Sequence, residues 1–388
     1  MTRTILPRLP AATAGDLAVC NHESFLDRCW YVLRRWPDRR GTAAQILDEE
    51  HRRMHFLGDT SALDRLATLS SELCARRPFC PDTHLIAAQV ASLLHQFAHA
   101  RAHLHEAAAC GASEDASSRV RLAIQQALGE KWPAVLGERQ QIAEATGALQ
   151  DLVPLGALLA EIGEYEDAER IYGRAIRQYQ DLSPFALAWV CFHIGVLWGE
   201  TVPEPDRDCA ATWYRQAIAY LPAYTRARIH LAEIHLDAGE YDAAAVMLWP
   251  VADSGDPEVK WRLAQAMAAQ GRAEEGELHR KAACAAFETL LARHELAFAD
   301  HAAAFYLSSG ADIGRAYDLA RLNLANRPTL RAFELASMAA KAACDDQCNA
   351  EVMVRAQAQW GATKAFAYSP LAKEISSLAT SSNQGVCS

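Results

Sequence analysis

The chain has 388 residues and a formal net charge of −10, from 38 lysines and arginines against 48 aspartates and glutamates. This acidic balance argues against a nucleic-acid-binding protein, because phosphate backbones are bound through a surplus of basic side chains. Hydrophobic residues make up 51% of the chain and aromatic residues 8%, and alanine is prominent among the apolar residues. Such a composition favours closely packed helices in a folded, globular protein.

Residues 1–20 predict a disordered N-terminus. Pro7, Arg8, Pro10 and Asp16 interrupt the apolar core that a signal peptide needs. No stretch of the chain reaches the roughly 20 apolar residues of a membrane helix. The 11 cysteines are odd in number and lack paired spacing, which is expected of reduced thiols in a helical core. We therefore expect a cytoplasmic protein that does not bind membranes.

Three further segments follow in chain order. Residues 21–81 carry helical stripes in FLDRCWYVLRRW and ALDRLATLSSEL, and they predict an N-terminal helical cap or a degenerate repeat. Residues 82–362 predict a repeat array. Residues 363–388 contain LAKEISSLA and then a polar stretch, which predicts a capping helix and a polar tail.

The array has a period near 34 residues. Small residues recur at this spacing near the start of every second helix, and turn glycines usually precede them by five residues. The small residues are Ala100, Ala134 and Ala168, then Ala210, Ala244, Gly276, Ala316 and Ala350. The turn glycines are Gly129, Gly163, Gly239 and Gly271, with Gly310 one position further away. Longer intervals are expected to be absorbed in loops, including the stretch before Ala303.

The clearest units read Leu155-Gly156-x2-Leu159, then Ala168-x3-Tyr172, and Ile194-Gly195-x2-Trp198, then Ala210-x3-Tyr214. This pattern resembles the tetratricopeptide repeat, over about residues 82–360. The resemblance implies an all-α fold, a right-handed superhelical α-solenoid of helix-turn-helix repeats. It also implies that the first helix of each pair lines a concave groove.

The register of these first helices gives the residues expected to contact a partner in the groove. They are Trp189, Phe192, Val196, Arg226, Ile229, Glu233, Glu258, Trp261 and Gln265. Aromatic and apolar side chains with isolated charges suit a peptide or a helix of another protein. For the tryptophans and Phe192, packing between repeats is the alternative interpretation, and for the charged residues it is a solvated face.

A histidine-rich segment, LHQFAHARAHLHEAAAC, lies at residues 94–110. His95, His99 and His103 are weak candidates for a metal site, because imidazoles four residues apart share one helical face. The repeat register places His95 in a turn, which breaks that stripe. We therefore expect no metal and no cofactor.

The chain carries no nucleophile-elbow motif and no glycine-rich phosphate loop. The repeats also leave no stretch of about 100 residues for a catalytic domain. We therefore expect a non-catalytic scaffold that binds another protein or peptide, and homo- or hetero-oligomers are compatible with it. The alternative is an accessory subunit that presents a peptide substrate or a metal to a separate enzyme.

Overall fold

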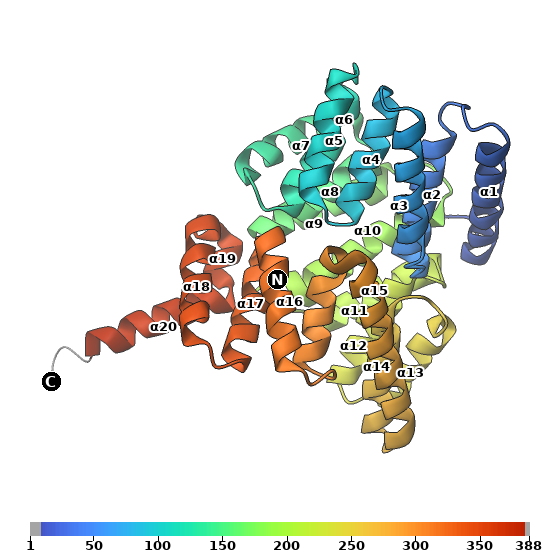
Figure 1. The fold of residues 1–388 in the computed structure, drawn as a ribbon. Helices are drawn as coiled ribbons and strands as arrows, with labels where there is room; N and C mark the ends of the chain where they lie inside the picture. Colours follow the sequence, from blue (N-terminus) through green and yellow to red (C-terminus); the bar gives the residue numbers. More distant parts are fainter. Residues whose placement is uncertain (1–8, 385–388) are drawn as a thin grey trace.

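The structure is a computed structural model that describes the backbone of residues 9–384 and the side chains of residues 9–377. All regular structure in this part of the chain is helical, so the predicted all-α fold class is confirmed. Successive helices pack side by side as antiparallel pairs along the chain, which forms an α-solenoid (Figure 1). No helix between residues 9 and 384 combines the length and the apolarity needed to cross a membrane.

Seven helices precede the best-matched repeats. They are α1 (Gly15–Arg35), α2 (Thr42–Leu57), α3 (Ala62–Arg76), α4 (Pro81–Leu93), α5 (Phe97–Ala109), α6 (Glu114–Ala127) and α7 (Trp132–Thr146). The expected disorder of residues 1–20 is wrong for residues 9–20, because α1 begins at Gly15 and Tyr220 donates a hydrogen bond to the Pro10 carbonyl at 2.8 Å. Residues 1–8 lie outside the described part of the chain.

The central helices match the predicted repeats most closely. They are α8 (Leu149–Ile162), α9 (Tyr165–Gln178), α10 (Pro184–Val196) with the π-helical turn η1 (Leu197–Thr201), α11 (Arg207–Tyr220), α12 (Thr225–Asp237), α13 (Tyr241–Leu248), the 3-10 turn η2 (Trp249–Val251) and α14 (Pro257–Ala269). In two of these pairs a glycine of the first helix lies directly against a tyrosine ring of the second. A Cβ atom on Gly156 would overlap Tyr172, and one on Gly195 would overlap Tyr214.

The C-terminal helices are α15 (Ala273–Leu307), α16 (Ile313–Asn326), α17 (Leu330–Ala342), α18 (Asp346–Trp360), α19 (Lys364–Tyr368) and α20 (Pro370–Gln384). The long interval before Ala303 is helical, not the expected loop, because α15 continues through a kink at His294, where φ is −139° and ψ is 50°. Helix α20 extends away from the body of the protein (Figure 1). Its first turn is anchored by Leu371, which is 2% exposed.

The turn glycines behave as the sequence predicts, with one difference. Gly163 and Gly239 have φ angles of +91° and +76°, a left-handed conformation that ends a helix at little cost for glycine. After α15 the positive φ of 51° falls on Ala311, the residue after the expected Gly310. The turn between α17 and α18 likewise uses Cys344, with a φ of 57°.

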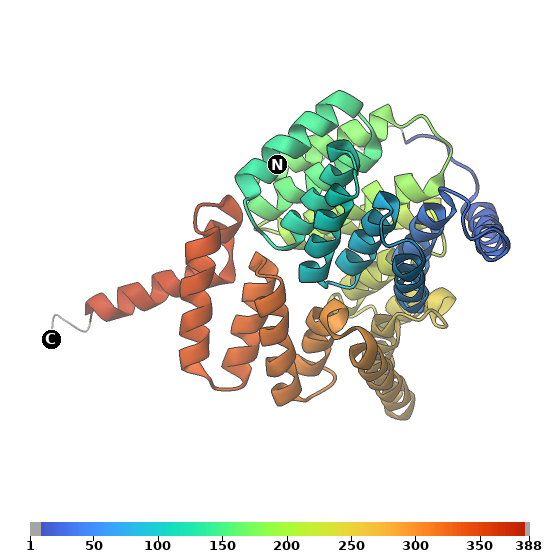
Figure 2. The same cartoon turned by 45° about the horizontal axis from the view of Figure 1, so that its top comes forward.

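The solenoid folds back on itself, so that segments far apart in sequence touch (Figure 2). Thr60 Oγ1 donates a hydrogen bond to the Gly255 carbonyl at 3.1 Å, and His95 Nδ1 lies 3.0 Å from the Leu296 carbonyl oxygen. Gly163 fits against the backbone of Ala365 so closely that a Cβ atom would clash there. These contacts bring the first helices of distant pairs toward a common interior.

Candidate functional site

The interior of the folded-back solenoid is lined by charged side chains, which we call the inner charged face. They lie on the first helices of successive pairs, α8, α10, α12, α14 and α17, on η1, on the second half of α15 and just after α16. The members are Glu161, His193, Glu200, Arg226, His230, Glu233, Glu258, Arg262, Asp300, His301, Arg327 and Arg331. Because each first helix buries its opposite side in the core, these polar residues are left on the interior surface.

Glu200 is a centre of this face. Its carboxylate accepts a hydrogen bond from the hydroxyl of Tyr214 at 3.3 Å, and His230 Nδ1 lies 2.5 Å away. Arg331 comes within 3.9 Å although it belongs to α17. Burial opposes the ionised carboxylate, but His230, Arg331 and Tyr214 outweigh it and lower the pKa of Glu200 to about 2. Glu200 is therefore a carboxylate at neutral pH.

Glu200, His230 and Glu233 have one ligand atom each within 4.8 Å of one another. Carboxylates and imidazole can bind divalent cations. Burial lowers the proton affinity of His230, yet the charges of Glu200 and Glu233 outweigh burial and raise its pKa. The group is therefore better described as an ion pair between His230 and two carboxylates than as a metal site.

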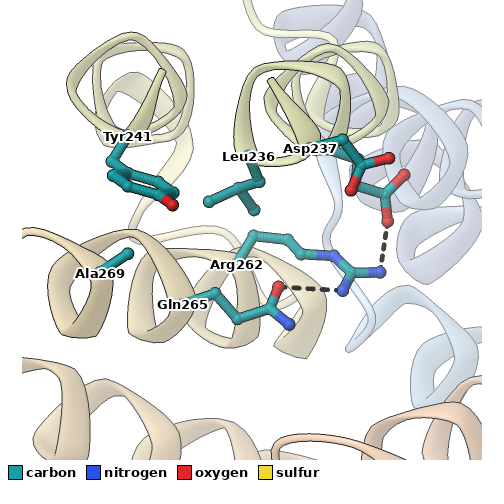
Figure 3. A pocket seen from close by; sticks show the side chains of 7 residues that line it. Leu236, Asp237, Tyr241, Arg262, Gln265 and Ala269 are labelled. Atoms are coloured by element: carbon teal, nitrogen blue, oxygen red, sulfur yellow. Dashed lines mark hydrogen bonds and ion pairs between the residues drawn. The ribbon is translucent and has the colours of Figure 1, made fainter. Parts of the chain in front are cut away.

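A pocket of about 320 Å³ opens between α12 and α14, and Tyr241 and Leu236 line its side (Figure 3). At its polar end Arg262 donates hydrogen bonds to Glu233 and, at 3.1 Å, to Gln265 Oε1. The guanidinium carbon of Arg262 lies 3.6 Å from the ring centroid of Trp261. This stacking and the ion pair hold the Arg262 side chain in one place.

A second chain of ion pairs crosses the face from α14 through α15 to the residue after α16. His301 Nδ1 contacts Glu258, and its Nε2 lies 3.8 Å from Asp300, which is 3.5 Å from Arg327. Asp300 is the strongest influence on His301. With Glu258 it overcomes the effect of burial and raises the pKa of His301 to about 9. His301 is therefore a cation at neutral pH.

For three carboxyl groups in this region, nearby positive charges do not offset the effect of burial on the pKa. Burial raises the pKa of Glu161 to about 7 although Gln126, Arg139 and Arg327 oppose the rise. Burial and the neighbouring Glu258 raise the pKa of Asp256 to about 6, and burial raises that of Glu334. The Glu161 side chain is exposed to solvent. These groups favour an additional positive charge nearby.

Arg226 lies at the other end of the face, among neutral histidines. Burial is the main cause that lowers the pKa of His51 and His193 to about 4, and the charge of Arg226 adds to it. His55 Nε2 is 3.0 Å from the hydroxyl of Tyr224. Neutral histidine rings therefore lie near the positive charge of Arg226.

No model of a protein family and no curated protein sequence matches the chain. Among solved structures it is similar to the APC/C hetero-tetramer Cut9-Hcn1, with 15% identity over 84% of this chain and 55% of that chain and a TM-score of 0.46. It is also similar to a tetratricopeptide repeat protein from Parabacteroides merdae, with 13% identity over 82% of this chain and 99% of that one and a TM-score of 0.38. For yeast Tom70 the identity is 9%, the coverage 88% and 85%, and the TM-score 0.34.

The chain spans about half the length of the Cut9-Hcn1 chain that it matches. At such distances the likeness carries nothing about function. The contacts of Gly156 with Tyr172 and of Gly195 with Tyr214 repeat one helix-pair geometry at the positions where the repeat pattern requires it. The fold is tetratricopeptide-like.

Within this tetratricopeptide-like array, four predicted groove residues lie half-buried along the interior: Arg226, Glu233, Glu258 and Gln265. Trp189 and Val196 are half-buried and pack against the central core. The other three predicted residues are core residues. Phe192, Ile229 and Trp261 are 6%, 2% and 4% exposed. The expectation that these three face an open groove is corrected, because the folded-back array covers α10, α12 and α14 on more than one side.

Several members of the inner charged face were not predicted from the sequence. His230 follows Arg226 by four residues on α12 and so shares its stripe, which is the signal that could have found it. Asp300 and His301 lie on the continued part of α15, outside the repeat register. Arg331 is the second residue of α17, where the pattern is weak. For these last three residues no sequence signal marks the interior position.

The three weak metal candidates do not come together. His95 sits in the turn after α4 with a φ of 53°, its Nδ1 directed to the Leu296 carbonyl and its ring stacked on Phe97. His99 is exposed on α5. His103 instead approaches His84 of α4, with 3.2 Å between their Nδ1 atoms. The expected turn position of His95 is the reason that the stripe breaks.

Proposed function

We propose that this chain is a non-catalytic scaffold whose inner charged face binds an extended segment of another protein that carries lysine or arginine side chains. The observation that carries the proposal is that Glu161 on this face, and Asp256 and Glu334 beside it, make no ion pair within the described part of the chain, in agreement with their raised pKa values. A carboxyl group with a raised pKa is stabilised as a carboxylate when a cation is placed beside it. Basic side chains of a partner would supply that cation.

An extended segment fits the layout of the face better than a small molecule does. The charged residues are spread over six helices from α8 to α17 and are not gathered around one deep cavity. Arg331 and His301 would at the same time receive a carboxylate of the segment, since their side chains are 79% and 42% exposed. A segment with both charges therefore has partners along its length.

The apolar anchors expected from the sequence have a smaller place in this proposal. Phe192, Ile229 and Trp261 are core residues, which leaves Tyr241 and Leu236 of the 320 Å³ pocket as apolar contacts. A cytoplasmic location belongs to the same proposal. Its support is that the ten cysteines within the described part of the chain are free.

A peptide selection tests the proposal. Random peptides of about twelve residues, displayed on phage, are selected on the purified full chain, and the enriched peptides are then measured by fluorescence anisotropy. We expect enrichment of lysine and arginine and binding that weakens as salt is raised. Glu161→Gln with Glu334→Gln should weaken the best peptide about tenfold, because two of the uncompensated carboxyl groups are removed.

The matched control is Glu144→Gln with Glu274→Gln. It removes the same charge from exposed positions on second helices, α7 and α15, and should leave binding unchanged. Circular dichroism confirms that both variants keep their helices. Selection of acidic or purely apolar peptides, or equal weakening by both pairs of substitutions, would contradict the proposal.

A further inference from the structure

Three side chains with metal-binding atoms meet where α3, α4 and α5 adjoin. Cys74 lies in the last turn of α3, His84 in the first turn of α4, and His103 in the middle of α5. Their Sγ and imidazole nitrogen atoms all lie within 4.8 Å of one another. None of the three belongs to the inner charged face, so this group is independent of the proposed function.

A hydrogen bond fixes the orientation of His84. Its Nε2 donates to the Pro78 carbonyl oxygen at 2.8 Å, which leaves the lone pair of Nδ1 free in the neutral ring. That Nδ1 points at His103 Nδ1, 3.2 Å away. A backbone carbonyl that holds the outer nitrogen of an imidazole is the usual support of a metal-binding histidine.

The separation of the two imidazole nitrogens matches a tetrahedral zinc site. With Zn–N distances of about 2.0–2.1 Å and a Zn–S distance of about 2.3 Å, two nitrogen ligands lie roughly 3.4 Å apart, and nitrogen and sulfur roughly 3.6 Å apart. The observed distance of 3.2 Å between the two Nδ1 atoms is close to the first value. Two imidazoles and a thiolate are also ligands that zinc prefers among common divalent cations.

A metal cation binds the unprotonated nitrogen of an imidazole and the thiolate form of a cysteine. Binding of Zn²⁺ would thus form the Zn–S bond and release one proton to solvent.

We propose that Cys74, His84 and His103 form a zinc site that ties α3, α4 and α5 together and leaves a fourth coordination position for water. Two of the ligands, Cys74 and His103, are half-buried, so the site is open to an ion from solution. A hydrogen bond between the two histidines would account for their contact but not for the thiol beside them. The metal accounts for all three.

The test uses the full chain, purified without a histidine tag and stripped of metal by a chelator. Titration with Zn²⁺ in a calorimeter should show one ion bound per chain. Cys74→Ser and His103→Ala should each weaken binding by about 100-fold or more. The control His99→Ala with His105→Ala removes two exposed histidines of the same helix and should leave affinity unchanged.

Cobalt provides a second measurement that does not depend on the variants. Co²⁺ bound to the unmodified chain should give the thiolate-to-cobalt charge-transfer band and the visible spectrum of a tetrahedral ion, and Cys74→Ser should lose the band. Zinc should raise the melting temperature of the unmodified chain but not of Cys74→Ser. Failure to bind one zinc ion, a cobalt spectrum without sulfur, or full affinity in Cys74→Ser would overturn the site. Peptide binding at the inner charged face would survive each of these results.

Discussion

The helix pairs α8–α9 and α10–α11 and the inner charged face differ in how they are built. In the pairs, Gly156 touches Tyr172 and Gly195 touches Tyr214, partners that are close in sequence. On the face, Glu200 of η1 meets Arg331 of α17, which lies about 130 residues later. The core is thus built from contacts between neighbouring helices that repeat along the chain. The inner charged face forms only when helices far apart in sequence come together. A local sequence pattern can specify the contacts of the core but not those of the inner charged face.

The largest expected effect separates a buried tryptophan from an exposed one. Trp261 is 4% exposed, packs edge-to-face on Phe305 and donates a hydrogen bond from Nε1 to Ser309 Oγ at 2.9 Å. Trp261→Ala should therefore lower the free energy of unfolding by about 3–5 kcal/mol, measured in urea. Trp249→Ala, at a side chain 46% exposed, should cost under about 1 kcal/mol. Equal costs would place Trp261 on the surface.

The next largest expected effect tests the close contact between α10 and α11. Gly195→Ala places a methyl group into the ring of Tyr214 and should cost about 1–3 kcal/mol of unfolding free energy. Gly137→Ala, on α7 with nothing within 4 Å of the new methyl group, should be neutral or stabilise by about 0.5–1 kcal/mol. If both glycines accept alanine equally, the close approach of α10 and α11 is not a constraint on the fold.

The smallest effect concerns the electrostatics of the inner charged face. The pKa of His301 is about 9, above its ordinary value of 6.5, so its stabilising contribution is complete below pH 6.5 and disappears as the pH rises to 9. Because the side chain is 42% exposed, solvent screening limits this contribution to about 1 kcal/mol. His301→Gln should flatten the decline of thermal stability between pH 6.5 and 9.

The control for this pH series is His193→Gln. The pKa of His193 is lowered to about 4, so its influence on stability falls below pH 6.5, where stability increases with pH. His193→Gln should therefore leave the slope above pH 6.5 as it is. An unchanged slope in His301→Gln would show that the ion pairs with Asp300 and Glu258 do not contribute.

Much of the fold could be predicted because it depends on residues near one another in sequence. The spacing of Ala168, Tyr172 and Gly163 was enough to place α8, α9 and the turn between them. The long α15 was not predictable in this way, since its continuation through His294 depends on contacts with α3. His294 Nε2 lies 2.8 Å from Asp64, a residue 230 positions earlier.

The same reasoning explains the mixed result for the site. Arg226, Glu233, Glu258 and Gln265 follow from the helical register alone, and the structure puts them along the interior. Burial of Trp261 follows from the second half of α15 covering α14, as its contact with Phe305 shows. The neighbours of His103 could not be predicted from the sequence either, because Cys74 and His84 belong to two other helices.

The pairing of Glu200 with Arg331 also sets an order of events during synthesis. A ribosome adds roughly 5–20 residues per second, so a nascent chain displays Glu200 on the order of ten seconds before Arg331 is made. The helix pairs α8–α9 and α10–α11 can form during that interval, but the charged interior cannot. A ligand of that interior would therefore bind only after α17 has been made and has packed onto the array. The early helix pairs can fold before any ligand is able to bind.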